Sequence, residues 1–284
     1  FNGSTITTPG SATFNVQGDV LQWHAGTLDA TGGLTNTGRF GFYGGNDRTL
    51  AGTLNNLCTI VQAGHRLFMA SGSAVNNQTG ATWEMQSGEI TFSGGGPATR
   101  NFTNNGTFLK TTGNQADVHV KLHNQETLKV DTVALRLFGG GTNTEATCQI
   151  AAAANVQFIG NTHNFTGAIT GTGEGIVYFN GAAIATPGGA SFNFPGELLQ
   201  WHAATITATD GLTNLGRLNL YSGNDRSLVG TLTNQGTVLQ IGNRLFLADG
   251  AVINNQPDGT YELQSGEFTF SGGGPATRNF NNSG

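Results

Sequence analysis

The chain has 284 residues, and 12 Lys+Arg against 17 Asp+Glu give it a formal net charge of −5. Charged residues make up 10% of the chain, against about 25% in an average domain, which excludes a coiled coil or a bundle of long helices. The weak acidity argues against a nucleic-acid-binding protein, because phosphate binding needs a basic surface. No apolar run approaches the ~20 residues of a membrane helix, so we expect no membrane insertion.

The chain repeats itself after 178 residues. Residues 1–106 align without a gap with residues 179–284, and 66 of these 106 positions are identical. Residues 107–178 occur once. The sequence therefore predicts a first repeat copy, 1–178, that continues directly into a second, incomplete copy, 179–284.

A shorter period of about 20 residues runs through both copies. An apolar residue, followed two positions later by Asn, leads into stretches in which apolar and polar residues alternate, which is typical of short β-strands. Gly and Asn enter positive φ at little cost, so we expect them at the corners between strands. The predicted corner asparagines are Asn36, Asn56, Asn77, Asn104, Asn124, Asn214, Asn234 and Asn255.

This period predicts an all-β fold, a parallel β-solenoid (β-helix) with coils of about 20 residues and a 178-residue super-repeat. Stacked coils would place successive corner asparagines above one another, where their side chains can form amide ladders. A β-sandwich is the alternative, because strands at 8–12-residue spacing also suit it. We favour the solenoid because a sandwich does not require the same corner motif every ~20 residues.

The alternation also predicts which side chains lie in the core. The predicted core residues are Ile60, Leu67, Met69, Trp83, Phe108, Val238, Leu245, Leu247 and Tyr261. Cys58 and Cys148 lie 90 residues apart, about four coils or ~20 Å along the axis. A disulfide needs Cα atoms within ~7 Å, so we expect no bond between these two cysteines.

The corner segments 75–84, 104–110 and 139–142 resemble the repeats of very large secreted bacterial β-solenoid surface proteins. These include autotransporter-passenger-like and filamentous-haemagglutinin-like adhesins. The resemblance spans the whole chain, and it implies a secreted or cell-surface location, a stalk-like or adhesive role and no catalytic residues. Cys58 departs from the family's corner pattern, and the second copy has Gly236 at that position.

Three functional hypotheses follow. The favoured one is a structural segment of an extracellular bacterial fibre, stalk or adhesin, with no enzymatic activity, no cofactor and no metal. The alternatives are a polysaccharide-degrading β-helix enzyme, which needs clustered carboxylates, and a glycan-binding module that uses exposed Trp or Tyr side chains. The acids are scattered, and the nearest candidate, Asp47 beside Arg48, is more typical of a turn with a surface ion pair.

Other candidate residues favour structural interpretations. Trp23 and Trp201 could stack on sugars, but the alternation groups them with core leucines. The alternation across residues 118–123 predicts His119, Lys121 and His123 on one polar strand face, where the two imidazoles are ~13 Å apart and too distant to share a metal.

Neither end of the sequence has the pattern of a solenoid cap. Phe1 begins at the phase of Phe179 within the repeat, and Gly284 stops at the phase of Gly106. Uncapped coils expose strand edges that recruit other strands. We therefore expect end-to-end self-association or continuation in a longer chain, with surface glycans as the other candidate partner.

Overall fold

The computed structural model describes residues 1–221, 224–270 and 277–284. It is all-β, and its parallel strands stack as a β-solenoid of about 12 turns spaced by roughly 22 residues. The predicted fold class is therefore confirmed, with coils slightly longer than the ~20 residues expected. Two compact units, Phe1–Gly141 and Thr142–Gly284, divide the chain inside the first repeat copy. Compact units and sequence copies need not coincide, because each solenoid coil contacts only its neighbours.

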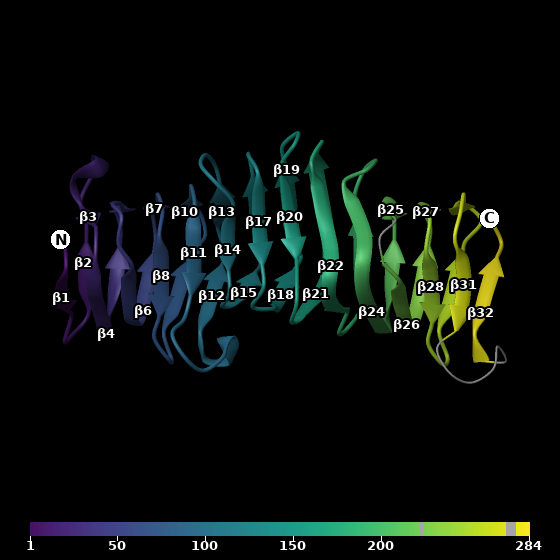
Figure 1. Ribbon diagram of the computed structural model, residues 1–284, viewed down its shortest axis with the longest axis horizontal. Helices are drawn as coiled ribbons and strands as arrows, with labels where there is room; N and C mark the ends of the chain where they lie inside the picture. Colours follow the sequence, from purple (N-terminus) through teal and green to yellow (C-terminus); the bar gives the residue numbers. More distant parts are fainter. Residues whose placement is uncertain (222–223, 271–276) are drawn as a thin grey trace. The chain divides into compact units, whose positions relative to one another are not determined.

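Unit 1 consists of short strands and two 3₁₀ turns (Figure 1). Its elements are β1 (Ser4–Thr7), β2 (Ala12–Phe14), η1 (Gly18–Val20), β3 (Gln22–Trp23), β4 (Gly26–Asn36), β5 (Arg39–Phe42), β6 (Arg48–Asn56), β7 (Thr59–Gln62), β8 (Arg66–Met69), β9 (Ala74–Asn77), β10 (Thr82–Met85), β11 (Gly88–Thr91), η2 (Pro97–Thr99), β12 (Asn101–Asn104), β13 (Thr107–Lys110), β14 (Ala116–Val118), β15 (Lys121–Asn124), β16 (Thr127–Val130) and β17 (Ala134–Leu137).

Unit 2 has the same construction, with longer strands in its first half. Its elements are β18 (Gly141–Thr144), which contains the boundary, β19 (Thr147–Ile150), β20 (Asn155–Phe158), β21 (Thr162–Gly173), β22 (Ile176–Ala185), β23 (Ala190–Asn193), β24 (Leu199–Asn214), β25 (Arg217–Leu220), β26 (Arg226–Asn234), β27 (Thr237–Gln240), β28 (Arg244–Leu247), β29 (Val252–Asn255), β30 (Thr260–Leu263), β31 (Glu267–Phe270) and β32 (Asn279–Asn282).

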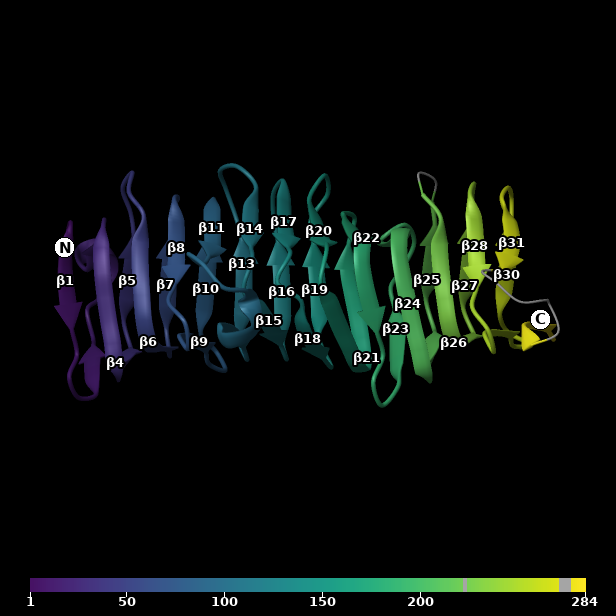
Figure 2. The ribbon, with the colours of Figure 1, turned by 60° about the horizontal axis from the view of Figure 1, so that its bottom comes forward.

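Each coil of unit 1 contributes to three parallel sheets, which we name faces A, B and C (Figure 2). Face A contains β3, β5, β7, β10, β13 and β16. Face B contains β1, the first halves of β4 and β6, β8, β11, β14 and β17. Face C contains β2, the second halves of β4 and β6, β9, β12 and β15. In unit 2 we give the same names to the faces built from the equivalent residues of the second repeat copy.

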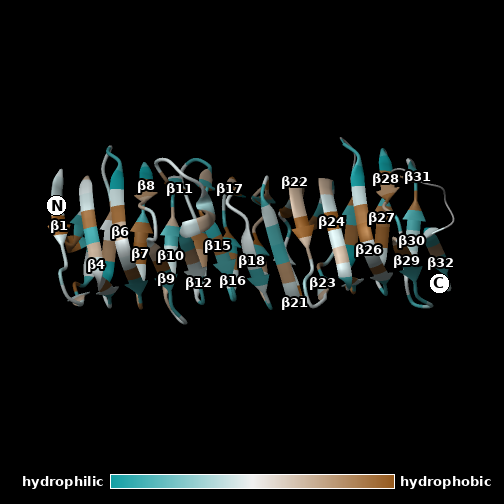
Figure 3. Cartoon of the chain, turned by 90° about the horizontal axis from the view of Figure 1, so that it is seen from below, coloured by the Kyte–Doolittle hydropathy of each residue, from teal (hydrophilic) through white to brown (hydrophobic). Residues whose placement is uncertain are grey.

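The core lies between the three faces, and apolar and polar residues alternate along the strands around it (Figure 3). Eight of the nine predicted core side chains are at most 6% exposed, which confirms the strand register. The ninth, Tyr261, is half-buried because its strand β30 pairs with β27 on one side, and the described residues supply no strand on the other. Its hydroxyl donates to Gln240 Oε1 at 2.8 Å.

The eight predicted corner asparagines are buried, and together with the exposed Asn282 they form two amide ladders. Within each ladder, the Nδ2 of every asparagine but the last donates to the Oδ1 of the asparagine in the next coil, at 2.7–2.8 Å, and most also donate to nearby backbone carbonyls. In unit 1 the ladder runs through Asn36, Asn56, Asn77, Asn104 and Asn124; in unit 2 it runs through Asn214, Asn234, Asn255 and Asn282. A buried amide costs free energy unless it is hydrogen-bonded, so the ladder is what allows asparagine at these corners.

Arg48 contradicts the surface location expected of it. Its side chain is fully buried and donates to the carbonyls of Trp23 at 2.7 Å, Gly64 at 3.1 Å and Tyr43 at 2.5 Å. Burial lowers the pKa of this guanidinium to about 10. The arginine thus fixes the loop between β5 and β6, and sequence alternation missed this because a charged residue at a turn normally faces water.

The segment containing His119, Lys121 and His123 is also different from the prediction. Strand β14 ends at Val118 and β15 begins at Lys121, so a corner separates the two histidines. His119 lies next to face B and stacks on Phe138 at 4.7 Å between ring centroids, whereas Lys121 and His123 lie on face C. A single polar strand face holding all three residues is therefore wrong.

Candidate functional site

A cluster of polar side chains on the outside of face A occurs in both repeat copies. We name it the tyrosine cluster. In unit 1 it consists of Asp19, Gln22, His24, Arg39 and Tyr43, and in unit 2 of Glu197, Gln200, His202, Arg217 and Tyr221. Four of the five residue types are identical between the copies, and the fifth exchanges one carboxylate for another.

In unit 1 the cluster centres on the Asp19 carboxylate. Arg39 Nε donates to Asp19 Oδ1 at 2.5 Å, and the Tyr43 hydroxyl donates to the same oxygen at 3.0 Å. Gln22 Nε2 donates to the Asp19 carbonyl at 2.7 Å, and Gln22 Oε1 lies 2.9 Å from His24 Nε2. Because an amide oxygen only accepts, this contact places the imidazole proton on Nε2. Gln22 therefore orients both the turn that carries Asp19 and the His24 ring.

Unit 2 reproduces these contacts with a longer carboxylate. Arg217 Nη2 lies 3.1 Å from Glu197 Oε1, and the Tyr221 hydroxyl donates to Glu197 Oε2. Gln200 Nε2 donates to the Glu197 carbonyl at 3.1 Å, and its Oε1 lies 2.9 Å from His202 Nε2. The same network therefore forms although the carboxylate differs by one methylene group.

Local structure places these side chains on the outside. Trp23 points into the core, so its neighbours Gln22 and His24 point out. Asp19 lies in η1, which turns the chain into β3. Tyr43 lies across Gly41, where a Cβ atom would be 2.1 Å from Tyr43 Cε2. The absence of a side chain at position 41 is therefore what lets the tyrosine ring lie flat on the sheet.

The second copy fills that position differently. Asn219, the equivalent of Gly41, is fully buried and donates to the carbonyls of Gly196 at 3.0 Å and Leu199 at 3.0 Å. Its Oδ1 accepts from Arg217 Nε at 2.8 Å. Asn219 thus joins the arginine of the cluster to the loop that carries the carboxylate, a bond that unit 1 lacks because it has glycine there.

Hydrogen bonds and burial shift the pKa values within the cluster. The bonds from Arg39 and Tyr43 lower the pKa of Asp19, and the bond to Asp19 raises the pKa of Arg39. Burial, followed by the contact with Asp19, raises the pKa of Tyr43. Burial, with a smaller contribution from nearby positive charge, lowers the pKa of His202. At neutral pH these pKa shifts keep Asp19 a carboxylate, Arg39 a guanidinium and Tyr43 a neutral phenol in unit 1, and His202 a neutral imidazole in unit 2.

A second duplicated contact lies on face B. Arg66 binds both carboxylate oxygens of Asp47, at 3.1 and 2.6 Å, and its guanidinium lies 5.0 Å from the Phe68 ring centroid. Arg244 binds Asp225 in the same way, at 3.1 and 2.5 Å. Asp47 therefore pairs with an arginine of the next coil rather than with the adjacent Arg48. Arginine engages both oxygens of each carboxylate in this pair, whereas in the tyrosine cluster of unit 1 both contacts use the same oxygen of Asp19.

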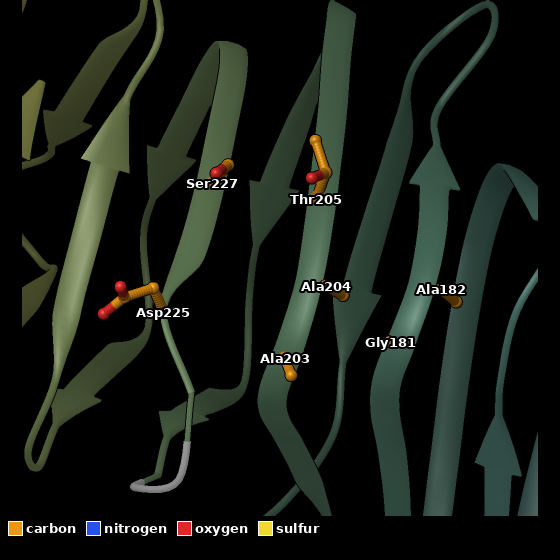
Figure 4. A pocket seen from close by; sticks show the side chains of 7 residues that line it. All are labelled: Gly181, Ala182, Ala203, Ala204, Thr205, Asp225 and Ser227. Carbon is orange, nitrogen blue, oxygen red and sulfur yellow. The ribbon is translucent and has the colours of Figure 1, made fainter. Parts of the chain in front are cut away.

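A depression of about 250 Å³ lies on the outside of face B in unit 2, and Figure 4 shows the residues that line it. Small side chains line it, and Asp225 stands at its edge. Its lining residues are Gly181, Ala182, Ala203, Ala204, Thr205, Asp225 and Ser227. The carboxylate at its edge is already held by Arg244, so we place the candidate site at the tyrosine cluster instead.

The structure also locates the other sequence candidates. Trp23 and Trp201 are 0% exposed, so they lie in the core and do not form a sugar-stacking surface. Cys58 and Cys148 are free thiols. In the ranges 1–221, 224–270 and 277–284, no group of three or more His, Cys, Asp or Glu side chains is placed to hold a metal ion. No helix in these ranges is long and apolar enough to cross a bilayer.

Sequence reasoning missed the tyrosine cluster. The available signal was that Arg39 and Tyr43 follow Asp19 by 20 and 24 residues, close to one coil, and that the second copy keeps this spacing from Glu197. Comparison with known proteins adds no name, since no family model, curated protein or solved structure matches the chain.

Proposed function

We propose that this chain is a structural segment of an extracellular bacterial fibre, stalk or adhesin, in which further coils stack on its terminal coils. The proposal includes a non-enzymatic role and a secreted or cell-surface location. The observation that carries it is the exposure of apolar side chains on the terminal coils, compared with their equivalents in the other repeat copy.

The C-terminal coil provides the clearest comparison. Phe280 is 39% exposed and Leu263 is 47% exposed, whereas their equivalents Phe102 and Met85 are both fully buried. In the first copy the following coil covers these positions, since β13 pairs with β10 and β15 pairs with β12. The exposure of Phe280 and Leu263 therefore supports stacking of a further coil on this surface.

The N-terminal coil shows the same difference. Val20 is 80% exposed, and its equivalent Leu198 is 2% exposed. In the second copy the preceding coil lies against this region, since Val177 pairs with Leu199 and the Val177 amide donates to the Leu198 carbonyl at 2.6 Å. Burying such apolar surface is favourable by about 25 cal/mol per Å², which supports coil-on-coil association at both ends.

The interior supports a load-bearing role. The amide ladder and the contacts between aromatic rings continue from coil to coil within each unit, as in the edge-to-face contact of Trp83 with Phe102 at 5.0 Å between ring centroids. Pulling neighbouring coils apart would break the backbone bonds of three faces and the ladder bond together. A filled core with continuous ladders suits a rod that resists extension.

The test is self-association measured by analytical ultracentrifugation and electron microscopy. Wild-type chain should form end-to-end oligomers whose proportion rises with concentration, and Phe280→Lys should reduce them because it places a charge on the stacking surface. Leu57→Gln is the matched control: Leu57 is 51% exposed at a corner, and the second copy has Gln235 there. A wild-type chain that stays monomeric at all concentrations, or equal loss of oligomers in both variants, would contradict coil stacking.

The location requires a separate test in the source cells. Antibodies against the folded chain should label intact cells or the culture medium. Protease added outside the cells should remove this labelling. Signal found only after lysis would contradict the proposed extracellular role.

A further inference from the structure

The tyrosine cluster has hydrogen-bonding capacity that the protein does not use. Asp19 Oδ1 accepts both bonds, from Arg39 and Tyr43, and Asp19 Oδ2 accepts none from the described residues. Arg39 uses Nε for this contact and also hydrogen-bonds with the Tyr43 side chain, and its five N–H groups exceed these two contacts. An open acceptor therefore lies next to open donors.

The cluster is accessible to a ligand in solution. The Asp19 side chain is 59% exposed and that of Arg39 is 33% exposed. An ion pair this exposed adds little to the stability of the fold, because water screens it. Stability therefore does not explain why carboxylate, arginine and tyrosine recur together in the second copy, where 40 of 106 aligned positions have changed (106 minus the 66 identical).

Tyr43 adds an aromatic surface to these polar groups. Its ring lies flat across Gly41 on the outside of face A, held there by its bond to Asp19. A flat ring beside a donor–acceptor pair matches a sugar, whose C–H face packs on the ring while neighbouring hydroxyls bind the polar groups. One hydroxyl donates to the carboxylate, and the next accepts from the guanidinium.

We propose that the tyrosine cluster of unit 1 is a binding site for a neutral carbohydrate. Asp19 and Arg39 bind two adjacent hydroxyl groups of one sugar, and the Tyr43 ring packs against it. A neutral ligand fits because the carboxylate and guanidinium charges cancel, and because the net charge of −5 repels polyanions. This proposal is independent of coil stacking and adds a ligand to the structural role.

The test is affinity gel electrophoresis of the whole chain in gels containing mannan, galactan, dextran or hydroxyethylcellulose, with polygalacturonate as the anionic probe. At least one neutral polymer should retard the wild-type chain. Tyr43→Ala should weaken the apparent affinity at least about tenfold, a loss expected when the stacking surface is removed. Tyr43→Phe should have a smaller effect, because the ring remains.

The matched control is Arg66→Gln combined with Arg244→Gln, which removes the exposed arginines of the face B ion pairs. This variant should be retarded like the wild type. Tryptophan emission checks folding, because Trp23 and Trp201 are buried and do not touch the ligand. The proposal fails if no neutral polymer retards the wild type, if polygalacturonate alone does so, or if the control loses as much affinity as the tyrosine variant.

Discussion

Replacing Asn56 with alanine tests the amide ladder. Asn56 is fully buried; it donates to Asn77 Oδ1 at 2.8 Å and to the Thr82 carbonyl at 3.0 Å, and accepts from Asn36 Nδ2 at 2.8 Å. A net hydrogen bond contributes about 1 kcal/mol, and a buried group left without a partner costs about 1–3 kcal/mol. Asn77 Oδ1 would lose its donor from the preceding coil. We therefore expect Asn56→Ala to lower the free energy of unfolding by about 3–5 kcal/mol.

The neighbouring Asn55 is the control. It lies on the outside of face C, where it accepts from Asn76 Nδ2 at 2.8 Å, and the second copy has Thr233 at its position. Asn55→Thr should lower the free energy of unfolding by less than about 1 kcal/mol, since the site is partly exposed. Urea denaturation followed by circular dichroism and tryptophan emission measures both variants. Equal stabilities for Asn56→Ala and Asn55→Thr would refute the claim that the inner ladder holds the corners.

Three further predictions concern other buried groups. Arg48→Met should destabilise the chain by about 3 kcal/mol in the same denaturation assay, because three carbonyls lose their donor; an unchanged midpoint would show that the guanidinium does not hold its loop. Cys58 should react with a thiol reagent at pH 8, and Cys148 should react only when the chain unfolds. The reason is that Cys148 is buried and that burial raises its pKa to about 12. Simultaneous reaction of both thiols in the folded chain would contradict this prediction. Trp83→Tyr should lower the free energy of unfolding by under about 2 kcal/mol, and Trp83→Ala by about 3–5 kcal/mol. Tyrosine occupies this position in the second copy, where its hydroxyl donates to the glutamine equivalent to Gln62. Similar losses of stability in both variants would show that the hydroxyl finds no such acceptor.

The fold was predictable because its two determinants are local in sequence. Alternation with a period of two assigns each side chain to the inside or outside, and the Asn motif marks the corner. Leu67 and Phe108 are buried for the first reason, and Asn104 forms ladder bonds for the second. A one-residue slip would have turned every side chain over, so the burial of these residues fixes the register.

The candidate site was not predictable in the same way, because it depends on the distance between coils. Successive ladder bonds link asparagines 20, 21 or 27 residues apart, so sequence spacing does not say which outer side chains stack. Asp19 contacts Tyr43 because the 24 residues that separate them amount to about one coil. Arg48 was missed for another reason: its partners are backbone carbonyls, which any sequence supplies and which therefore leave no pattern.

The amide ladders also have a direction. In every rung the Nδ2 of the earlier coil donates to the Oδ1 of the later one, from Asn36 towards Asn124 and from Asn214 towards Asn282. The row does not reach the first coil, because Phe14 occupies the ladder position beside Asn36, so only the Asn282 end of the chain carries an amide there. The proposed coil stacking between molecules would set the Asn282 end of one chain against the Phe14 end of the next, which is a heterologous contact. A heterologous contact that does not close into a ring would give the proposed filament a direction and two chemically different tips.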